Sequence, residues 1–299
     1  VGDAGLRKDT QMHRTRSRLA AVGGILAVMG VAASCVPQAP TTESWTFRAN
    51  SVTVNDSQDE IRDPFFDLCI AIPSCEDEPY TLNIGFRVKI GVAGSADAFV
   101  VNNRTDAPEN VGEGVTVNLT GNSQNAVTWN GIKPLDVLDL LNSSNKLEVV
   151  GVYTWASEED TIGNGLAADG VAGVLEAALN ATLAAGSLPS DASLILDLVL
   201  DNILGALGLL AQNVPLFGLG DDVLGGALYI GIGAKGDLAN IINSAIGNTP
   251  PITFAIPLLD LPPDIVGGGF FTMKNSKTFT QTFSGAGGTH SHNFGVSKT

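Results

Sequence analysis

The sequence is poor in cysteine, histidine and positive charge. It has three cysteines and three histidines in 299 residues, and its 16 Lys and Arg stand against 31 Asp and Glu, for a net charge of −15. A field of that sign repels nucleic acid and anionic lipid headgroups, so a nucleic-acid partner is excluded. The sequence also lacks a GxSxG motif, which argues against esterase or serine-protease chemistry of the α/β-hydrolase kind.

Residues 1–35 read as an export signal. Arg14, Arg16 and Arg18 precede an uncharged stretch from Leu19 to Val36 that is rich in Ala, Gly and Val and ends in small residues. This is the charged, apolar and small-residue order of a secretory signal, so the segment is kept out of fold reasoning. The alternative is a transmembrane anchor, because an apolar run of this length sits at the lower limit for a bilayer span.

The last residues of this segment resemble a bacterial lipobox. Ala32, Ala33 and Ser34 precede Cys35, which would carry lipid as the first residue of the mature chain. Release by cleavage near Ser34, without lipid, is the alternative. Either way we expect a protein that is secreted or anchored on the outer face of the cell membrane. Membrane contact is then expected only through a lipid anchor or an uncleaved signal.

Cys69 and Cys75 are the two cysteines left after Cys35. Two cysteines close together in an exported chain usually pair, so we predict a Cys69–Cys75 disulfide that pins a local loop. The alternative is a metal site, but the pair lacks nearby histidines and the CxxC knuckles of a zinc site.

The remainder reads as a sheet-based domain after a linker at 36–44. In the stretch Tyr80 to Val92, apolar and polar residues alternate, which predicts a long strand with one buried face. Further strands are predicted at 44–54, 115–119, 126–129, 147–155, 252–261, 277–283 and 289–297. A short helix is predicted at 134–142, where the apolar residues have helical spacing after a proline.

Between these strands the periodicity becomes helical. Helices are predicted at 171–185, 192–212 and 237–246, while 218–235 favours a strand or a Gly-rich packed segment. The sequence therefore predicts an α+β fold: a mainly antiparallel, β-sandwich-like core at 45–161 and 250–299, with a mainly helical insertion at 162–249. Either the apolar side chains of the insertion pack on the sheet, or they contact lipid or another hydrophobe.

Calcium is the cofactor hypothesis that the acidic residues suggest. Hard cations outside the cell collect carboxylate and carbonyl oxygens, and two acidic loops could meet if their strands pair. The alternative is a pair of solvated acidic turns, because no EF-hand spacing occurs. The candidate ligands are Asn55, Asp56, Asp59, Glu60, Glu76, Asp77 and Glu78.

His290 and His292 are the only histidines after the export segment. At i and i+2 of a strand they share a face with Phe294 and Val296, so one metal ion could use both. The alternative is two exposed histidines near the end of the chain. A Ser-His-Asp triad would have to use one of them.

Three stretches resemble a group of uncharacterised actinobacterial secreted proteins: Val52 to Glu60, Glu76 to Val92 and Pro215 to Gly233. The resemblance implies secretion and no particular activity. The DEPY segment at 77–80 also resembles the start of a strand in extracellular β-sandwich modules. We therefore expect a non-enzymatic binding or structural protein of the cell envelope, with a carboxylate-dependent envelope hydrolase as the alternative.

Overall fold

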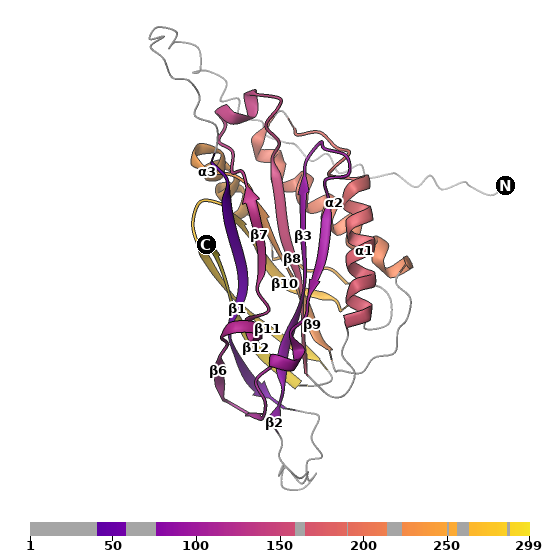
Figure 1. The fold of residues 1–299 in the computed structure, drawn as a ribbon, viewed down its shortest axis with the longest axis vertical. Coiled ribbons are helices and arrows are strands. Elements are labelled where there is room, and N and C mark those ends of the chain that lie inside the picture. Colours follow the sequence, from indigo (N-terminus) through magenta and orange to yellow (C-terminus); the bar gives the residue numbers. More distant parts are fainter. Residues whose placement is uncertain are drawn as a thin grey trace, which may run out of the picture. The chain divides into compact units, whose positions relative to one another are not determined.

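A computed structural model describes residues 41–57, 76–158, 165–189, 191–213, 223–249, 251–255, 263–285 and 288–299. Residues 40–299 form one compact unit, in which two β-sheets stack and helices cover the second of them (Figure 1). The α+β, sheet-rich fold predicted from the sequence is confirmed.

The first sheet, here the outer sheet, is antiparallel. It contains β1 (Glu43–Asp56), β6 (Thr116–Asn118), β7 (Val127–Ile132), β11 (Lys277–Gly285) and β12 (Gly288–Lys298). The order is β11-β12-β1-β6, and β7 also pairs with β1. A β-bulge interrupts the β1–β12 register between Ala49 and Ser51.

The second sheet, here the central sheet, has the order β10-β9-β8-β3-β4. Its strands are β3 (Pro79–Lys89), β4 (Asp97–Val101), β8 (Glu148–Glu158), β9 (Val223–Ile232) and β10 (Ile265–Thr272). The β9–β10 pair is parallel and the other pairs are antiparallel. The short strands β2 (Glu76–Asp77) and β5 (Val111–Gly112) pair separately.

Three α-helices lie on the face of the central sheet that points away from the outer sheet. They are α1 (Gly165–Ala181), α2 (Ile195–Asn213) and α3 (Gly236–Ile246). Leu175, Val199 and Ile203 are buried against this face, while Asp197 and Asp201 are exposed on the other side of α2. The apolar side chains of the helical stretch thus pack on the sheet. Single 3₁₀ turns lie at η1 (Arg104–Asp106), η2 (Gly121–Gln124), η3 (Leu138–Leu141) and η4 (Ala192–Leu194).

Aromatic rings fill the space between the two sheets. Phe47 of β1 lies 4.9 Å from Tyr229 of β9 and 5.2 Å from Phe294 of β12, measured between ring centroids. Trp129 of β7 lies 6.5 Å from Phe271 of β10. Such ring pairs stabilise a core beyond the area that they bury, so this cluster holds the sheets together.

The central sheet is buried on both faces, which corrects the expectation that β3 has one buried face. Its alternate residues Thr81 and Asn83 point into the sandwich and are 2% and 0% exposed. All 11 residues of β8 are buried, as expected for the middle layer of three. Polar residues on β3 therefore mark the interior between the sheets and not a solvent face.

Helix α3 is capped from outside its own segment. Lys235 precedes it without a capping side-chain bond, and the Asp136 carboxylate accepts hydrogen bonds from the Asp237 and Leu238 backbone N–H groups at 3.0 and 3.2 Å. Desolvation raises the pKa of Asp136. The opposing effects together outweigh it, so the net shift is downward: they are the backbone N–H groups of Val137, Leu238 and Asp237, and the positive charge of Lys235. The carboxylate thus fixes the start of α3 against the segment at 135–137.

The structure differs from the predicted elements in several places. The helix expected at 134–142 is reduced to the 3₁₀ turn η3, and the strand expected at 252–261 shows only an isolated bridge at Phe254, with 256–262 outside the described residues. The strand favoured at 218–235 is present as β9, but it belongs to the central sheet and so lies outside the helical layer. Strands β4 and β10 were not predicted.

Candidate functional site

Rows of hydroxyl and amide side chains cross the solvent face of the outer sheet, here the polar face. The aligned residues of one row are Thr282, Ser291, Thr53 and Thr116, from β11, β12, β1 and β6. In this row Thr282 bonds Ser291 at 2.8 Å and Thr53 bonds Thr116 at 2.7 Å. In the neighbouring row, Asn293 accepts a bond from Asn50 at 3.0 Å and donates to Thr280 at 3.3 Å. These rows form because successive side chains of each strand point to opposite faces, with the apolar ones inside the sandwich and the polar ones on the solvent face.

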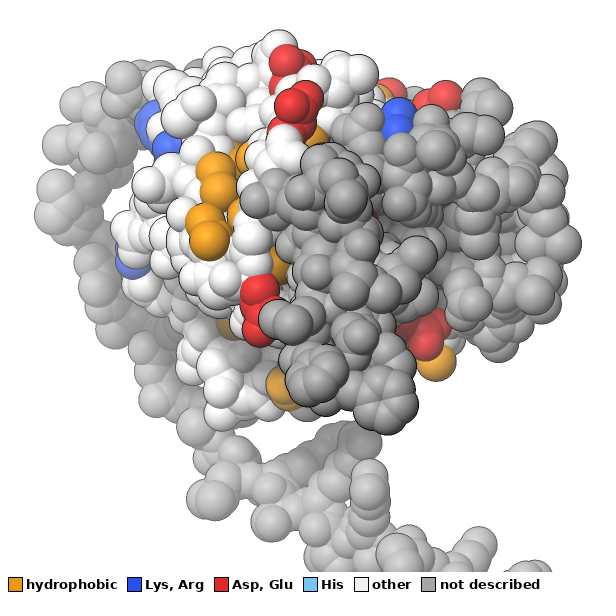
Figure 2. All heavy atoms as spheres, turned by 90° about the horizontal axis from the view of Figure 1, so that it is seen from below, with side chains coloured by type: hydrophobic (Ala, Val, Ile, Leu, Met, Phe, Trp, Pro, Cys, Tyr) orange, Lys and Arg blue, Asp and Glu red, His pale blue; other side chains and the backbone are white. Residues whose placement is uncertain are grey.

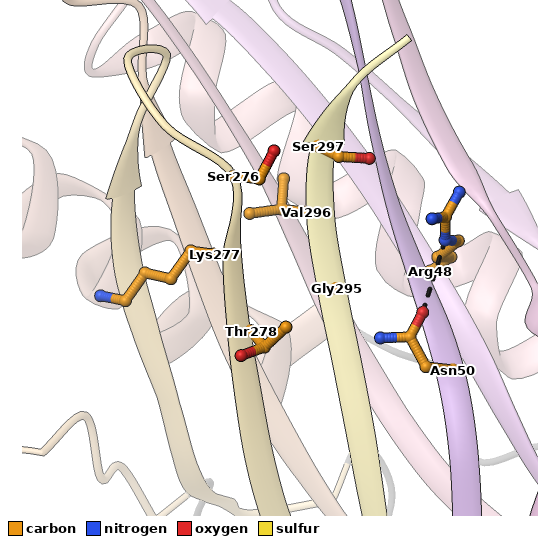
Figure 3. A pocket seen from close by; sticks show the side chains of 8 residues that line it. All are labelled: Arg48, Asn50, Ser276, Lys277, Thr278, Gly295, Val296 and Ser297. Carbon is orange, nitrogen blue, oxygen red and sulfur yellow. Dashed lines mark hydrogen bonds between the residues drawn. The ribbon is translucent and has the colours of Figure 1, made fainter.

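One position of the next row lacks a side chain, and this opens a pocket. Gly295 of β12 pairs with Thr278 on one side and with Arg48 on the other. A Cβ at Gly295 would meet the Asn50 side-chain nitrogen at 2.7 Å, so the space above the glycine is lined by its neighbours. The pocket has a volume of about 290 Å³ and is also lined by Ser276 and Ser297 (Figure 3).

The bulge in β1 positions the two most polar groups of this pocket. Because the register shifts between Ala49 and Ser51, Asn50 is the additional residue. Its side chain stands beside that of Arg48, and the Arg48 Nε donates to the Asn50 Oδ1 at 3.4 Å (Figure 3). No described carboxylate forms an ion pair with Arg48, so its guanidinium is the positive group that a ligand would meet.

The second cation near the pocket points elsewhere. The Lys277 ammonium donates to the Phe270 carbonyl oxygen at 2.8 Å and lies 5.0 Å from the centre of the Phe279 ring, and Figure 3 shows the side chain directed away from Gly295. Burial lowers the pKa of Lys277. The pocket therefore presents one guanidinium among hydroxyls and an amide.

The outer sheet carries few carboxylates for so acidic a chain. Among the residues of its five strands the only acids are Glu43 and Asp56, at the two ends of β1, and the bases are Arg48, Lys277 and Lys298. The chain as a whole has a net charge of −15. The polar face is therefore a region where an anionic group meets little repulsion.

A second polar cluster lies inside the sandwich, at the end where β1 finishes. The His290 Nε2 is 2.7 Å from the Asp77 Oδ2, and both side chains are 0% exposed. His292 is also 0% exposed, with its ring stacked on Phe294 at 5.8 Å and edge-on to Phe283 at 5.6 Å. The interpretation of these histidines as exposed residues near the chain end is wrong.

The two histidines differ in their electrostatic surroundings. Burial, and then the positive charge that His290 carries when protonated, lower the pKa of His292 from 6.5 to about 3. Neither ring nitrogen of His292 has a hydrogen-bond partner among the described residues. His292 is thus a neutral aromatic ring in the core, while His290 has a carboxylate partner.

His290 connects the two acidic loops of the calcium prediction, because it is next to one loop and contacts a residue of the other. Val54, one residue before Asn55, pairs with His290, whose ring bonds Asp77. Asn55 is exposed and Asp56 and Glu78 are half-buried, but the Asp77 carboxylate points into the sandwich. Within the described ranges, no group of three or more His, Cys, Asp and Glu side chains could hold a metal ion. Asp59 and Glu60 lie outside those ranges, so the calcium site stays a prediction.

Cys35, Cys69 and Cys75 also lie outside the described residues, so the lipid attachment and the disulfide stay predictions. In the part of the chain that the structure covers, none of the helices combines the length and apolar character of a bilayer span.

Two buried carboxylates of the sandwich, Glu148 and Asp77, have basic side chains as partners. Glu148 is 2% exposed and accepts from the Arg87 Nε at 2.9 Å, while Arg87 also donates to the Asn130 carbonyl oxygen at 3.1 Å. Asp77 is held by His290 at the other end. The structure gives neither carboxylate an opening to solvent.

Sequence reasoning missed the pocket. Its signal was present, because Thr278, Thr280 and Thr282 alternate with aromatic or amide residues, and Gly295 interrupts the matching polar series of β12. What the sequence could not give is the strand order that aligns these positions. Comparisons with protein-family models, with curated proteins and with solved structures found no match.

Proposed function

We propose that the protein is an exported, non-enzymatic binding protein of the cell envelope, and that its ligand is a carboxylate-bearing saccharide held on the polar face. The observation that carries the proposal is the pocket above Gly295, where Arg48 stands among hydroxyl and amide groups. A guanidinium binds a carboxylate through paired N–H donors, and hydroxyls and amides exchange hydrogen bonds with sugar hydroxyls.

The dimensions and charge of the site support this class of ligand. A volume of about 290 Å³ is at the lower end of the range for small-molecule pockets, which suits one sugar residue of a longer chain. The rows on either side would continue the contact with further hydroxyl groups. The scarcity of carboxylates in the outer sheet spares an acidic saccharide the repulsion that the rest of the chain would exert.

The test is affinity electrophoresis of the full chain through gels that contain a uronate polysaccharide or, in parallel, neutral dextran. We expect retardation by the uronate polymer alone. Arg48→Gln should weaken binding by about 10- to 100-fold, because it removes a charged hydrogen-bond donor. Gly295→Thr should remove binding by filling the pocket, and it should not unfold the sheet, because the added atoms meet the movable end of the Asn50 side chain.

Thr53→Val is the matched control, since Thr53 lies on the same face but does not line the pocket. It should bind as the wild type does. The proposal would be refuted if the uronate polymer retarded none of the proteins. It would also be refuted if Gly295→Thr, with the melting temperature of the wild type, were retarded as strongly as the wild type.

A further inference from the structure

All seven lysines that follow residue 40 lie at one end of the sandwich, here the lysine end. Lys298 pairs with Trp45 near the start of β1, and Lys277 pairs with Val296. Lys133 directly follows Ile132, which pairs with Glu43.

The remaining four lysines follow from the register of the central sheet. Lys89 pairs with Glu148, and Lys146 stands two residues before Glu148. The end of β9 pairs with the end of β10, and Lys235 and Lys274 follow these strand ends. The bond from Arg87 to the Asn130 carbonyl oxygen links the same ends of the two sheets.

Several carboxylates at this end are already engaged. Lys298 forms an ion pair with Glu43 at 2.7 Å, Lys235 lies 3.7 Å from Asp139, and Asp136 caps α3. Lys133 and Lys274 donate instead to the amide oxygens of Asn145 and Asn240, at 3.0 and 2.6 Å. Figure 2 views the molecule from the opposite end, where the blue side chains appear only near the margin. All seven lysines that follow residue 40 are therefore gathered at the lysine end, and the other end of this strongly acidic chain has none.

The lysine end also exposes an apolar patch on η3. Leu138 and Leu141 are 77% and 81% exposed, the two highest values among the large apolar residues that the structure describes, and Val137 beside them is 36% exposed. Only five residues separate Ile132, the partner of Glu43, from Leu138. The described chain begins at Thr41, two residues before Glu43, which pairs with Ile132.

We infer that the lysine end docks on an anionic bilayer surface, with Leu138 and Leu141 entering the interface and the lysines facing lipid headgroups. Lysines near an anionic surface add to membrane affinity, and exposed leucines add apolar burial. A lipid on Cys35, or an uncleaved apolar run at 19–36, would precede the fold at this end and hold it close to a membrane. The net negative charge of the rest of the chain would turn the other surfaces away. This inference does not depend on the saccharide ligand.

Tryptophan quenching in vesicles tests the docking with the full chain. Trp45, Trp129 and Trp155 are at most 2% exposed, so a tryptophan introduced at an exposed site is the only one open to lipid. The test variant is Leu138→Trp. The control is Val115→Trp, because Val115 is 46% exposed and its carbonyl oxygen bonds Val54 at the other end of β1. The span from Glu43 to Val54 is roughly 35 Å along the strand.

We expect brominated acyl chains to quench the Leu138→Trp variant in vesicles of equal parts phosphatidylcholine and phosphatidylglycerol, and much less in phosphatidylcholine alone. The Val115→Trp variant should stay unquenched in both. Adding Lys133→Gln and Lys146→Gln to Leu138→Trp should lower the docking equilibrium about 30-fold. Equal quenching at 138 and 115, equal quenching in both lipids, or no quenching at 138 would each overturn the inference, and the last would leave this end for a protein partner.

Discussion

Replacing His292 by phenylalanine should remove a large part of the acid sensitivity of this fold. His292 is 0% exposed and its ring is stacked on Phe294 at 5.8 Å. A phenylalanine ring can occupy the same space, and it deletes two ring nitrogens that have no hydrogen-bond partner among the described residues. The charged groups that face this position are His290 and its partner Asp77.

The magnitude follows from proton linkage. The pKa of His292 falls from 6.5 to about 3 in the folded protein, so between these values the unfolded chain binds the extra proton. The free energy of unfolding that neutral His292 contributes is therefore retained above pH 6.5. It is lost as the pH falls from 6.5 towards 3, by about 1.4 kcal/mol for each pH unit. Between pH 7 and pH 5 the loss due to His292 alone is about 2 kcal/mol.

Urea unfolding at the two pH values, followed by the fluorescence of the three buried tryptophans, measures this loss. With an m-value of about 3 kcal/mol/M, the wild-type midpoint should fall by roughly 0.7 M more than that of His292→Phe. Carboxylates contribute equally to both proteins, so they cancel in the comparison. Identical pH dependence of the two midpoints would refute the assignment of His292 as a neutral residue in the core.

Three further predictions concern other parts of the chain. Asp136→Ala should reduce the free energy of unfolding by about 1 kcal/mol at neutral pH in chemical denaturation, because α3 loses its cap. Since the pKa of Asp136 is lowered on folding, this difference should vanish only as the pH falls below the ordinary aspartate pKa of 3.8. Gly268→Ala should destabilise by about 3 kcal/mol or more, because Gly268 has φ of +140° and a Cβ there would overlap the backbone of β9. Gly173→Ala, on the exposed side of α1, should instead stabilise slightly. Cys69 and Cys75 should both resist thiol labelling in exported protein that is denatured without reductant, and full labelling would contradict the disulfide.

The sequence was most informative where one periodicity persists. The alternation over Tyr80 to Val92 predicts β3, which ends at Lys89. The change to helical spacing predicts α2 and α3 to within three residues, and it predicts α1 with a start six residues too late. β10 was missed because IVGGGFFT contains three consecutive glycines that weaken any strand pattern. It forms because it pairs in parallel with β9, a contact between distant segments.

The candidate site was less predictable because it depends on pairing between distant strands. Gly295 reads as an ordinary interruption until its neighbours are known to be Thr278 and Arg48. The histidines illustrate the same limit, since proximity to the end of the chain suggested exposure. The sequence does not show that β12 lies between β11 and β1, with its alternate residues inside the sandwich.

The way β1 joins the fold also determines how the protein would respond to mechanical force. A pull on the leading segment enters at Thr41 and runs along β1, which is 14 residues long and has β12 on one side and β6 and β7 on the other. A saccharide in the pocket would resist that pull from β11 and β12 as well as from Arg48. The load is then directed along β1, so the hydrogen bonds to its neighbours are strained together in shear and not broken one by one. We expect a tether at residue 41 to withstand a higher force than one that peels β11 from the sheet edge through Lys277, and single-molecule pulling from the two points would measure the difference.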